Sequence, residues 1–330
     1  MKYLEKIGEF GIIDVFRKKA WVRKDISVGI GDDCAIIKNI HRSLAVSCDA
    51  MIEGVHFLWR KITPKQLGWK ALATSLSDLA ACGAEPLAAF LVLGLRGDES
   101  RSWLSEFSRG VSQCAGTYGV SLAGGDTVQS PSAQIVSFTV LGKVWQRPVL
   151  RSGARKGDLI GVCGTLGDAA AGLEILLGSA RGVRAQVAKK LVTAQLQPKP
   201  QFAQSIILCR FVASMIDTSD GLLKDLAHIC AESGVGARLD ADRIPLSDEL
   251  KSFANARGKD ALSYALTGGE DYRLLFTVAE KKAARLLERL KNAGHQATLF
   301  GQITAGRKVE VFYKGRQLKI SQEGFEHFRK

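Results

Sequence analysis

Short apolar runs bounded by turn residues recur along the first half of the chain. Three of them, residues 43–49, 87–95 and 134–144, are rich in Val, Ile, Leu, Ala and Phe. Apolar runs of this length between turn residues are typical of β-strands. The pattern therefore predicts three strands in the N-terminal half.

Between the first two predicted strands the apolar period changes to that of a helix. Thr63 and Pro64 suit the N-cap and the first helical position, and Gly83 and Pro86 suit the end. A second helix is expected over residues 99–119. The apolar positions of the first helix share one face: Leu67, Ala71, Leu72, Leu76 and Leu79.

The second half repeats an order of strand, glycine turn and helix. Residues 158–177 and 210–234 both have this order, and a strand (270–278) and a charged amphipathic helix (280–294) follow. The polar, basic segment 146–158 separates the halves. We therefore predict an α/β (α+β) protein of two mixed sheet-and-helix domains, 1–150 and 151–330.

Composition narrows the class of protein. The chain has 330 residues, of which 46% are hydrophobic, and it contains no apolar run of about 18 residues that would span a membrane. Its first residues do not have the pattern of a signal peptide. Seven cysteines without a CxxC pair indicate reduced thiols, so we expect a cytoplasmic protein that makes no use of a membrane.

The net charge of +13 allows two interpretations. Lys and Arg can bind the phosphates of nucleic acids, or they can form a solvated surface that attracts small anions. The basic residues are spread along the chain, and no RNA-recognition or helix-turn-helix signature accompanies them. We therefore expect no nucleic-acid partner.

Acidic motifs stand out against this basic background. Each one alone is explained by a turn or a helix cap. Together their aspartates suggest a site for a hard cation, because oxygen ligands select Mg²⁺ held jointly with phosphates. Asp78 is the hardest to explain structurally, since it falls within an apolar helix pattern. The motifs are GIGDD (29–33), SCD (47–49), LSD (76–78), GGDT (124–127), IDTSDG (216–221) and TGGEDY (267–272).

Other nucleotide and catalytic motifs do not compete with this interpretation. The sequence has no Walker-type GxxxxGK[ST], no HExxH, no GxSxG and no kinase HRD/DFG set. The GxxGxxG spacing in residues 161–168 is explained by a strand–turn–helix. His56 is either a structural residue or a donor to an anionic substrate.

In their order along the chain, these motifs resemble the thiamine-monophosphate kinase family, a relative of aminoimidazole ribonucleotide synthetase. The resemblance runs from about Gly29 to Phe328, and EGVHF (53–57) and LTGGEDY (266–272) favour the kinase branch. It implies the aminoimidazole ribonucleotide synthetase type of fold and a homodimer paired through the N-terminal domains. It also implies ATP and several Mg²⁺ near that junction, with thiamine monophosphate as the phosphate acceptor.

The resemblance also implies roles for individual residues. No general base is implied, and Asp32 would support the metal cluster. The metal ligands would be Asp33, Ser47, Cys48, Asp49, Asp78, Asp126, Asp217 and Asp220. ATP would contact Tyr118, Gly125, Asp126, Arg151 and Ser219, and the substrate would contact His56, Glu270 and Phe325.

Cys48 and Phe325 each allow two interpretations. Cys48 replaces a hydroxyl residue that is common in the family, and a thiol is a poor Mg²⁺ ligand. Either its backbone carbonyl serves or one metal site is weaker. Phe325 either stacks on the cationic thiazolium or the pyrimidine, or joins Phe328 in fixing the C-terminus to the core.

Three other functions stay open on the sequence alone. One is a nucleotide- or cation-binding protein without turnover, and another is a basic RNA-binding domain. The third is a different ATP-dependent synthetase of the same superfamily. The first would bind ATP with Mg²⁺ but release no ADP, and the second would bind RNA regardless of Mg²⁺ and ATP. The third would use ATP with a different small substrate.

Overall fold

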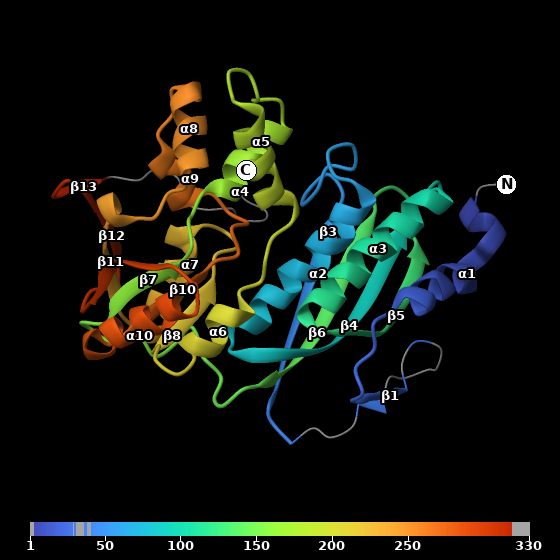
Figure 1. Cartoon of the computed structure of the whole chain (residues 1–330), viewed down its shortest axis with the longest axis horizontal. Helices are drawn as coiled ribbons and strands as arrows, with labels where there is room; N and C mark the ends of the chain where they lie inside the picture. Colours follow the sequence, from blue (N-terminus) through green and yellow to red (C-terminus); the bar gives the residue numbers. More distant parts are fainter. Residues whose placement is uncertain (1–2, 29, 31–35, 38–40, 319–330) are drawn as a thin grey trace. The chain divides into compact units, whose positions relative to one another are not determined.

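A computed structural model describes residues 3–28, 30, 36–37 and 41–318 of the chain (Figure 1). The chain divides into two compact units. Unit 1 comprises Met1–Leu79 and Ala84–Trp145, and unit 2 comprises Ala80–Gly83 and Gln146–Lys330. The chain thus passes from one unit to the other at 145/146, and the short piece Ala80–Gly83 also groups with unit 2.

Unit 1 is built on a four-stranded sheet in the order β3-β6-β4-β5. β4 and β5 are parallel, whereas β6 is antiparallel to both β3 and β4. A two-stranded pair, β1-β2, stands apart from this sheet. The elements are α1 (Tyr3–Lys19), β1 (Ile26–Val28), β2 (Ile36–Ile37), β3 (Leu44–Ile52), α2 (Pro64–Ala81), β4 (Ala84–Leu95), α3 (Arg101–Tyr118), β5 (Ser121–Gln129) and β6 (Ile135–Val144).

The two faces of this sheet differ in burial. Alternate residues of β6, such as Phe138 and Val140, are buried on one face. The ladder pairs Ser47 with Val140 and Asp49 with Phe138, so both polar side chains lie on the buried face. The opposite face, here called the open face, carries the exposed side chain of Val46. Strand alternation explains the difference, because successive side chains point to opposite sides.

α2 and α3 run side by side in unit 1 (Figure 1), and two glycines let them approach closely. A Cβ on Gly110 would lie 1.9 Å from the backbone oxygen of Lys65, and one on Gly68 would lie 2.3 Å from that of Phe107. A side chain at either position would therefore push the helices apart.

The ends of the helices follow the sequence signals. α2 begins at Pro64, as expected. α3 begins after Ser100, whose hydroxyl accepts the N–H of Trp103, and it ends at Gly119 with a left-handed φ of 66°. Both helices predicted for unit 1 are therefore confirmed.

The GGDT motif lies within a strand and does not form a turn. Gly125 pairs with Leu91 of the neighbouring parallel strand β4. Its φ is +151°, and a Cβ would lie 1.8 Å from the oxygen of Leu91. The interpretation of this motif as a turn was wrong, because the glycines serve close pairing of two backbones.

Unit 2 is built on a seven-stranded sheet in the order β13-β12-β9-β11-β7-β10-β8, in which β12 and β9 are the parallel pair. The strand–turn–helix order predicted twice is confirmed by β7 with α4 and by β8 with α7. The strands are β7 (Leu159–Cys163), β8 (Ser214–Asp217), β9 (Gly236–Asp240), β10 (Leu274–Val278), β11 (Ala297–Thr304), β12 (Val309–Tyr313) and β13 (Arg316–Leu318).

The helices of unit 2 pack on a core that the sheet residues supply, with Ile160, Val162, Leu275 and Phe300 fully buried. None of the helices in the described parts of either unit has the length and apolarity of a membrane span. The helices are α4 (Asp168–Leu176), α5 (Ala185–Leu196), α6 (Phe202–Leu208), α7 (Leu222–Ser233), the 3₁₀ turn η1 (Ala241–Arg243), α8 (Asp248–Arg257), α9 (Ala261–Thr267) and α10 (Glu280–Asn292).

Candidate functional site

Three of the predicted ligands meet between β3 and α2. The hydroxyl of Ser47 donates to Asp78 Oδ2 at 2.5 Å. The carboxyl of Asp49 is hydrogen-bonded to Asp78 and to Ser75, which lies one helical turn before Asp78. The period of two in the strand and of about 3.6 in the helix brings these four side chains to one place.

The two carboxyl groups of this group favour a proton or a cation between them. Burial raises the pKa of Asp49, while the hydrogen bonds with Ser75 and Asp78 act to lower it. A hydrogen bond between two carboxyl groups requires a proton on one of them, and a cation can take the place of that proton. The donors are all oxygens, so this group fits a hard cation such as Mg²⁺.

Two further predicted ligands of unit 1 lie on the open face. The thiol of Cys48 contacts the hydroxyls of Ser137 at 3.9 Å and Thr139 at 3.3 Å. Asp126 is paired with Val92, whose side chain is exposed on that face. Because adjacent strands are about 4.8 Å apart, Asp126 on β5 lies roughly 14 Å from β3. The side chains of Cys48 and Asp126 therefore lie apart from the Asp49–Asp78 pair in this unit.

The nucleotide residue expected on α3, Tyr118, lies at the end of that helix beside Trp69. The two ring centroids are 6.1 Å apart at an angle of 57°. Burial raises the pKa of the Tyr118 hydroxyl, so the group stays neutral. Tyr118 and Trp69 thus present two neighbouring flat aromatic surfaces.

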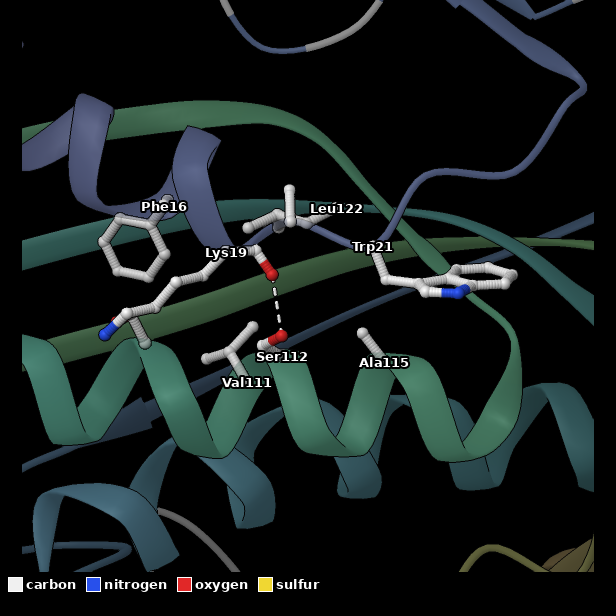
Figure 2. Close-up of a pocket in the computed structure, with 9 residues that line it drawn as sticks. Phe16, Lys19, Trp21, Val111, Ser112, Ala115 and Leu122 are labelled. Atoms are coloured by element: carbon white, nitrogen blue, oxygen red, sulfur yellow. Dashed lines mark hydrogen bonds between the residues drawn. The ribbon is translucent and has the colours of Figure 1, made fainter.

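Unit 1 also contains a small pocket between α1 and α3 (Figure 2). The Ser112 hydroxyl donates to the Lys19 carbonyl oxygen at 2.7 Å across it. The ammonium of Lys19 donates to Ser105 and Ser108. The pocket has an empty volume of about 210 Å³, part of which is open solvent. Ligand sites usually have volumes of about 300–1,000 Å³. The pocket is therefore too small for ATP.

In unit 2 the IDTSDG and TGGEDY motifs form two loops in direct backbone contact. The N–H of Glu270 donates to the Ser219 oxygen at 2.7 Å, and that of Tyr272 donates to the Thr218 oxygen at 2.8 Å. A Cβ on Gly269 would lie 2.6 Å from the Ser219 oxygen. The glycine is thus needed for the close approach of the two loops.

The TGGEDY loop has an unusual backbone. Glu270 and Tyr272 have φ values of 66° and 50°, a region that non-glycine residues seldom adopt. Such conformations persist where the surroundings impose them, and they cluster at functional sites. Gln195 of α5, which is 3% exposed, donates through Nε2 to the Glu270 carboxylate.

The aspartates of these loops have different surroundings. Asp217 is buried at the end of β8, whereas Asp220 is ion-paired with Lys224 at 2.8 Å. Burial, with help from the Asp220 carboxylate, raises the pKa of Asp225 to about 7. Burial likewise raises the pKa of Asp271 to about 7, and this carboxyl accepts the N–H groups of Gly167 and Ala169 at the start of α4. Asp271 is thus a helix-capping residue.

The remaining predicted residues lie in connecting segments or outside the described residues. His56 lies in the turn after β3, and Arg151 is exposed, with its carbonyl oxygen accepting the hydroxyl of Ser233. Asp32, Asp33, Phe325 and Phe328 lie outside the described residues. Within the described residues, no cluster of three or more His, Cys, Asp or Glu side chains is arranged to hold a metal ion.

The sequence motifs do not identify Ser75, Gln195 or the partners of the EGVHF loop as site residues. A signal for Ser75 was present, because it precedes Asp78 by three residues in a predicted helix. Gln195 carries no comparable signal. Its contact with Glu270 joins positions 75 residues apart, which only the folded chain brings together.

Comparisons with known proteins agree with the motifs. Models of the N- and C-terminal domains of AIR synthase related proteins match residues 31–144 and 155–314. A thiamine-monophosphate kinase of Escherichia coli (strain K12) is 40% identical over 328 residues, which are 97% of this chain and 98% of that protein.

Solved structures give the same result. The crystal structure of a thiamine-monophosphate kinase from Stenotrophomonas maltophilia K279a matches with a TM-score of 0.82 and 35% identity, over 93% of this chain and 96% of that one. A structure described as AaThiL complexed with AMPPCP and TMP matches with a TM-score of 0.79 and 34% identity, over 99% of both chains. With both domain types matched and full-length relatives above 30% identity, this chain belongs to the thiamine-monophosphate kinase family of AIR synthase related proteins.

Proposed function

We propose that this protein transfers the γ-phosphoryl group of ATP to thiamine monophosphate and forms thiamine diphosphate and ADP. The observation that carries the proposal is the oxygen-lined pair of Asp49 and Asp78 in a chain of this family. A related structure holds AMPPCP, an ATP analogue, together with TMP, which supports the same pair of substrates here.

The proposed reaction needs charge neutralisation more than it needs proton transfer. The nucleophile is a phosphate oxygen whose second pKa is about 6, so it is mostly deprotonated at neutral pH. Two unit charges about 4 Å apart repel by roughly 4 kcal/mol at an effective dielectric constant of about 20. Positioning and opposite charge are therefore the main requirements of the site.

Mg²⁺ is the proposed cofactor, and Asp49 and Asp78 are the residues that hold it. Their close carboxyl groups fit a divalent ion, with Ser47 and Ser75 fixing their orientation. When bound, Mg²⁺ supplies positive charge next to the phosphates. Because Asp126 is on the opposite face of the sheet, it would have to hold a separate cation within this unit. Asp33, Cys48 (through its backbone carbonyl), Asp217 and Asp220 stay proposed ligands.

The proposed binding residues fall into two groups. Gly125, Asp126, Arg151, Ser219 and Tyr118 are assigned to ATP. His56, Glu270 and Phe325 are assigned to thiamine monophosphate. Two observations support the assignment of Glu270 to the substrate. Its backbone is strained, and the amide of Gln195 orients its carboxylate.

We also propose a homodimer that forms through the open face of unit 1. Val46 is 63% exposed there, and Val92 and Val128 add further exposed apolar side chains. Exposed apolar side chains that gather on one face of a sheet mark an interaction site more often than free surface. We place the enzyme in the cytoplasm, where the six free cysteines of the described residues would stay reduced.

The test is incubation of the purified protein with ATP, Mg²⁺ and thiamine monophosphate, followed by chromatography of the thiamine esters. We expect thiamine diphosphate to appear in step with ADP and to be lost when EDTA is added. Mg²⁺-dependent ATP binding without product would instead favour a non-catalytic protein or a synthetase with another acceptor. RNA retention that ignores Mg²⁺ and ATP would favour the RNA-binding alternative.

A further inference from the structure

The segment EGVHFLW, residues 53–59, turns sharply after β3. Gly54 has a φ of +83°, and its N–H donates to the Phe57 oxygen at 2.8 Å. The N–H of His56 donates to the Ile52 oxygen at 2.9 Å. The turn therefore holds His56 directly above the end of the strand.

The turn also determines which ring nitrogen of His56 carries a proton. The N–H of Ile52 donates to Nδ1 of His56 at 3.0 Å. A ring nitrogen that accepts a hydrogen bond carries no proton, so in the neutral ring the proton is on Nε2. Nε2 can then donate a hydrogen bond, and a phosphate oxygen can accept it.

Arg96, directly after β4, holds this segment on both sides of His56. Its Nη1 donates to the two carboxylate oxygens of Glu53 at 2.8 and 2.9 Å. Its guanidinium lies over the ring of Trp59, 4.7 Å from the centroid. The side chains of Arg96 and Glu53 are only 19% and 17% exposed, so water screens their attraction weakly.

A second layer of buried groups fixes Arg96 and Glu53 in turn. Glu53 Oε2 accepts the N–H of Gln134 at 3.0 Å, and the Gln134 amide donates to Glu99 at 2.7 Å. Glu99 also accepts the N–H of Arg96 at 3.1 Å. Gln134 and Glu99 are 0% and 2% exposed. The network therefore ties the turn to the ends of β4 and β6.

We infer that Arg96 is a positioning residue for the phosphorylated substrate, acting through Glu53 and Trp59 on the orientation of His56. The inference rests on the proposed contact between His56 and thiamine monophosphate. Arg96 would make no contact with the substrate itself. Its loss should leave the turn free to move, so that Nε2 of His56 no longer meets the substrate phosphate in one fixed geometry.

Steady-state kinetics of Arg96→Met test the inference. We expect KM for thiamine monophosphate to rise about tenfold or more, as befits the loss of a charged hydrogen-bonded pair, and KM for ATP to change less than about twofold. Glu53→Gln, which keeps the shape of the side chain, should have the same selective effect. Arg109→Met is the matched control, because the Arg109–Glu106 pair is exposed on α3.

Combining Arg96→Met with His56→Ala shows whether Arg96 acts through His56. If it does, Arg96→Met adds no further increase in KM in the His56→Ala background, because the group that it positions is gone. Equal increases in KM for both substrates, or effects of the two substitutions that add fully, would overturn the inference.

Nitrogen NMR of the histidine side chains gives a measurement that does not depend on turnover. In the unaltered protein we expect an unprotonated Nδ1 and a protonated Nε2 at His56, identified by the signal that His56→Ala removes. In Arg96→Met and Glu53→Gln we expect averaged nitrogen shifts. Unchanged shifts in both variants would overturn the positioning role. Averaged shifts in a protein that does not phosphorylate thiamine monophosphate would instead contradict only the proposed substrate.

Discussion

At the scale of single residues, the main feature of unit 1 is a pair of carboxyl groups in contact. Asp49 comes from a strand and Asp78 from a helix, and the hydroxyls of Ser47 and Ser75 complete the group. A pair of this kind is costly to keep in a protein unless a cation or a proton joins it. This pair, in a chain of the thiamine-monophosphate kinase family, is the physical basis of the proposed magnesium site.

Replacing either carboxylate should stop the reaction without unfolding the protein. We expect Asp49→Asn and Asp78→Asn each to lower kcat at least about 100-fold, because an amide binds Mg²⁺ far more weakly than a carboxylate does. The measurements are thiamine diphosphate formation over a range of Mg²⁺ concentrations and thermal unfolding. Asp14→Asn, which alters an exposed ion pair with Lys18 on α1, is the control. Normal turnover with unchanged Mg²⁺ dependence in both variants would contradict the assignment.

At the scale of elements, α2 and its position against α3 determine where Asp78 points. The close contact at Gly68 and Gly110 fixes the distance between the helices. α2 in turn contacts β3 through the hydrogen bond between Ser47 and Asp78. A packed interior transmits small displacements instead of absorbing them. The geometry of the carboxyl pair therefore depends on glycines far from it in the sequence.

Two glycines of α3 should respond to alanine in opposite ways. At Gly110 a Cβ would lie 1.9 Å from a backbone oxygen, so Gly110→Ala should lower the free energy of unfolding by about 1–3 kcal/mol or more. At Gly116 a Cβ would meet nothing within 4 Å, so Gly116→Ala should raise it by up to about 1 kcal/mol. Chemical denaturation of both variants measures the difference. Equal effects would contradict the helix contact.

The segment between α1 and β1 should give unit 1 a defined pH dependence. A hydrogen bond from Lys143, with a further one from Arg23, lowers the pKa of Asp25 below its ordinary value of 3.8. The ionised carboxylate therefore stabilises the folded state above about pH 4, and this contribution is lost as the pH falls through the lowered pKa.

The corresponding substitution is Asp25→Asn. We expect it to lower the free energy of unfolding by about 1.5–3 kcal/mol at pH 7, and the difference from the unaltered protein should shrink at pH 3. Denaturant midpoints at pH 7, 4 and 3 provide the measurement. Asp248→Asn is the control, because Asp248 pairs with Lys251 at an exposed site. A difference that is constant across pH would contradict the charged role of Asp25.

At the scale of the whole molecule, the feature that remains unexplained within one chain is the open face of the unit 1 sheet. A sheet usually covers both of its faces or presents polar side chains to water on one of them. Here Val46, Val92 and Val128 are exposed. A second copy of the chain is the occupant that we propose.

A charged side chain on this face should therefore change the oligomeric state. We expect Val46→Glu to convert the proposed dimer to a monomer in analytical ultracentrifugation, because a carboxylate that loses its water in an interface without a partner is unfavourable. Leu177→Glu is the matched control, since Leu177 is 62% exposed in unit 2 against 63% for Val46. A dimer that survives Val46→Glu, or a monomer before any change, would contradict the proposed interface.

Much of this protein could be predicted from sequence, because local signals suffice for it. The period of apolar residues predicts α2, and short apolar runs predict β3, β4 and β6. Pro64 marks the start of α2, and the expected range 99–119 for α3 ends at the Gly119 that caps it. The motifs were specific enough to indicate the family before any fold was known. Asp49 and Asp78 could also be singled out, because a carboxylate beside an apolar run or within an apolar helix needs a partner.

The tertiary structure alone decided which of these residues act together. Alternation along a strand says that Ser47 and Asp49 share a face, but only the packing of α2 shows that this face is the one with Asp78. Likewise, only the parallel pairing of β4 with β5 places Asp126 on the opposite face of the sheet. The same pairing makes GGDT part of a strand, although a turn was expected there. The contacts of Arg96 with Glu53 and of Gln195 with Glu270 join distant segments, and no local periodicity encodes them. Sequence thus determined the elements and the chemistry, whereas long-range packing determined the geometry in which that chemistry is presented.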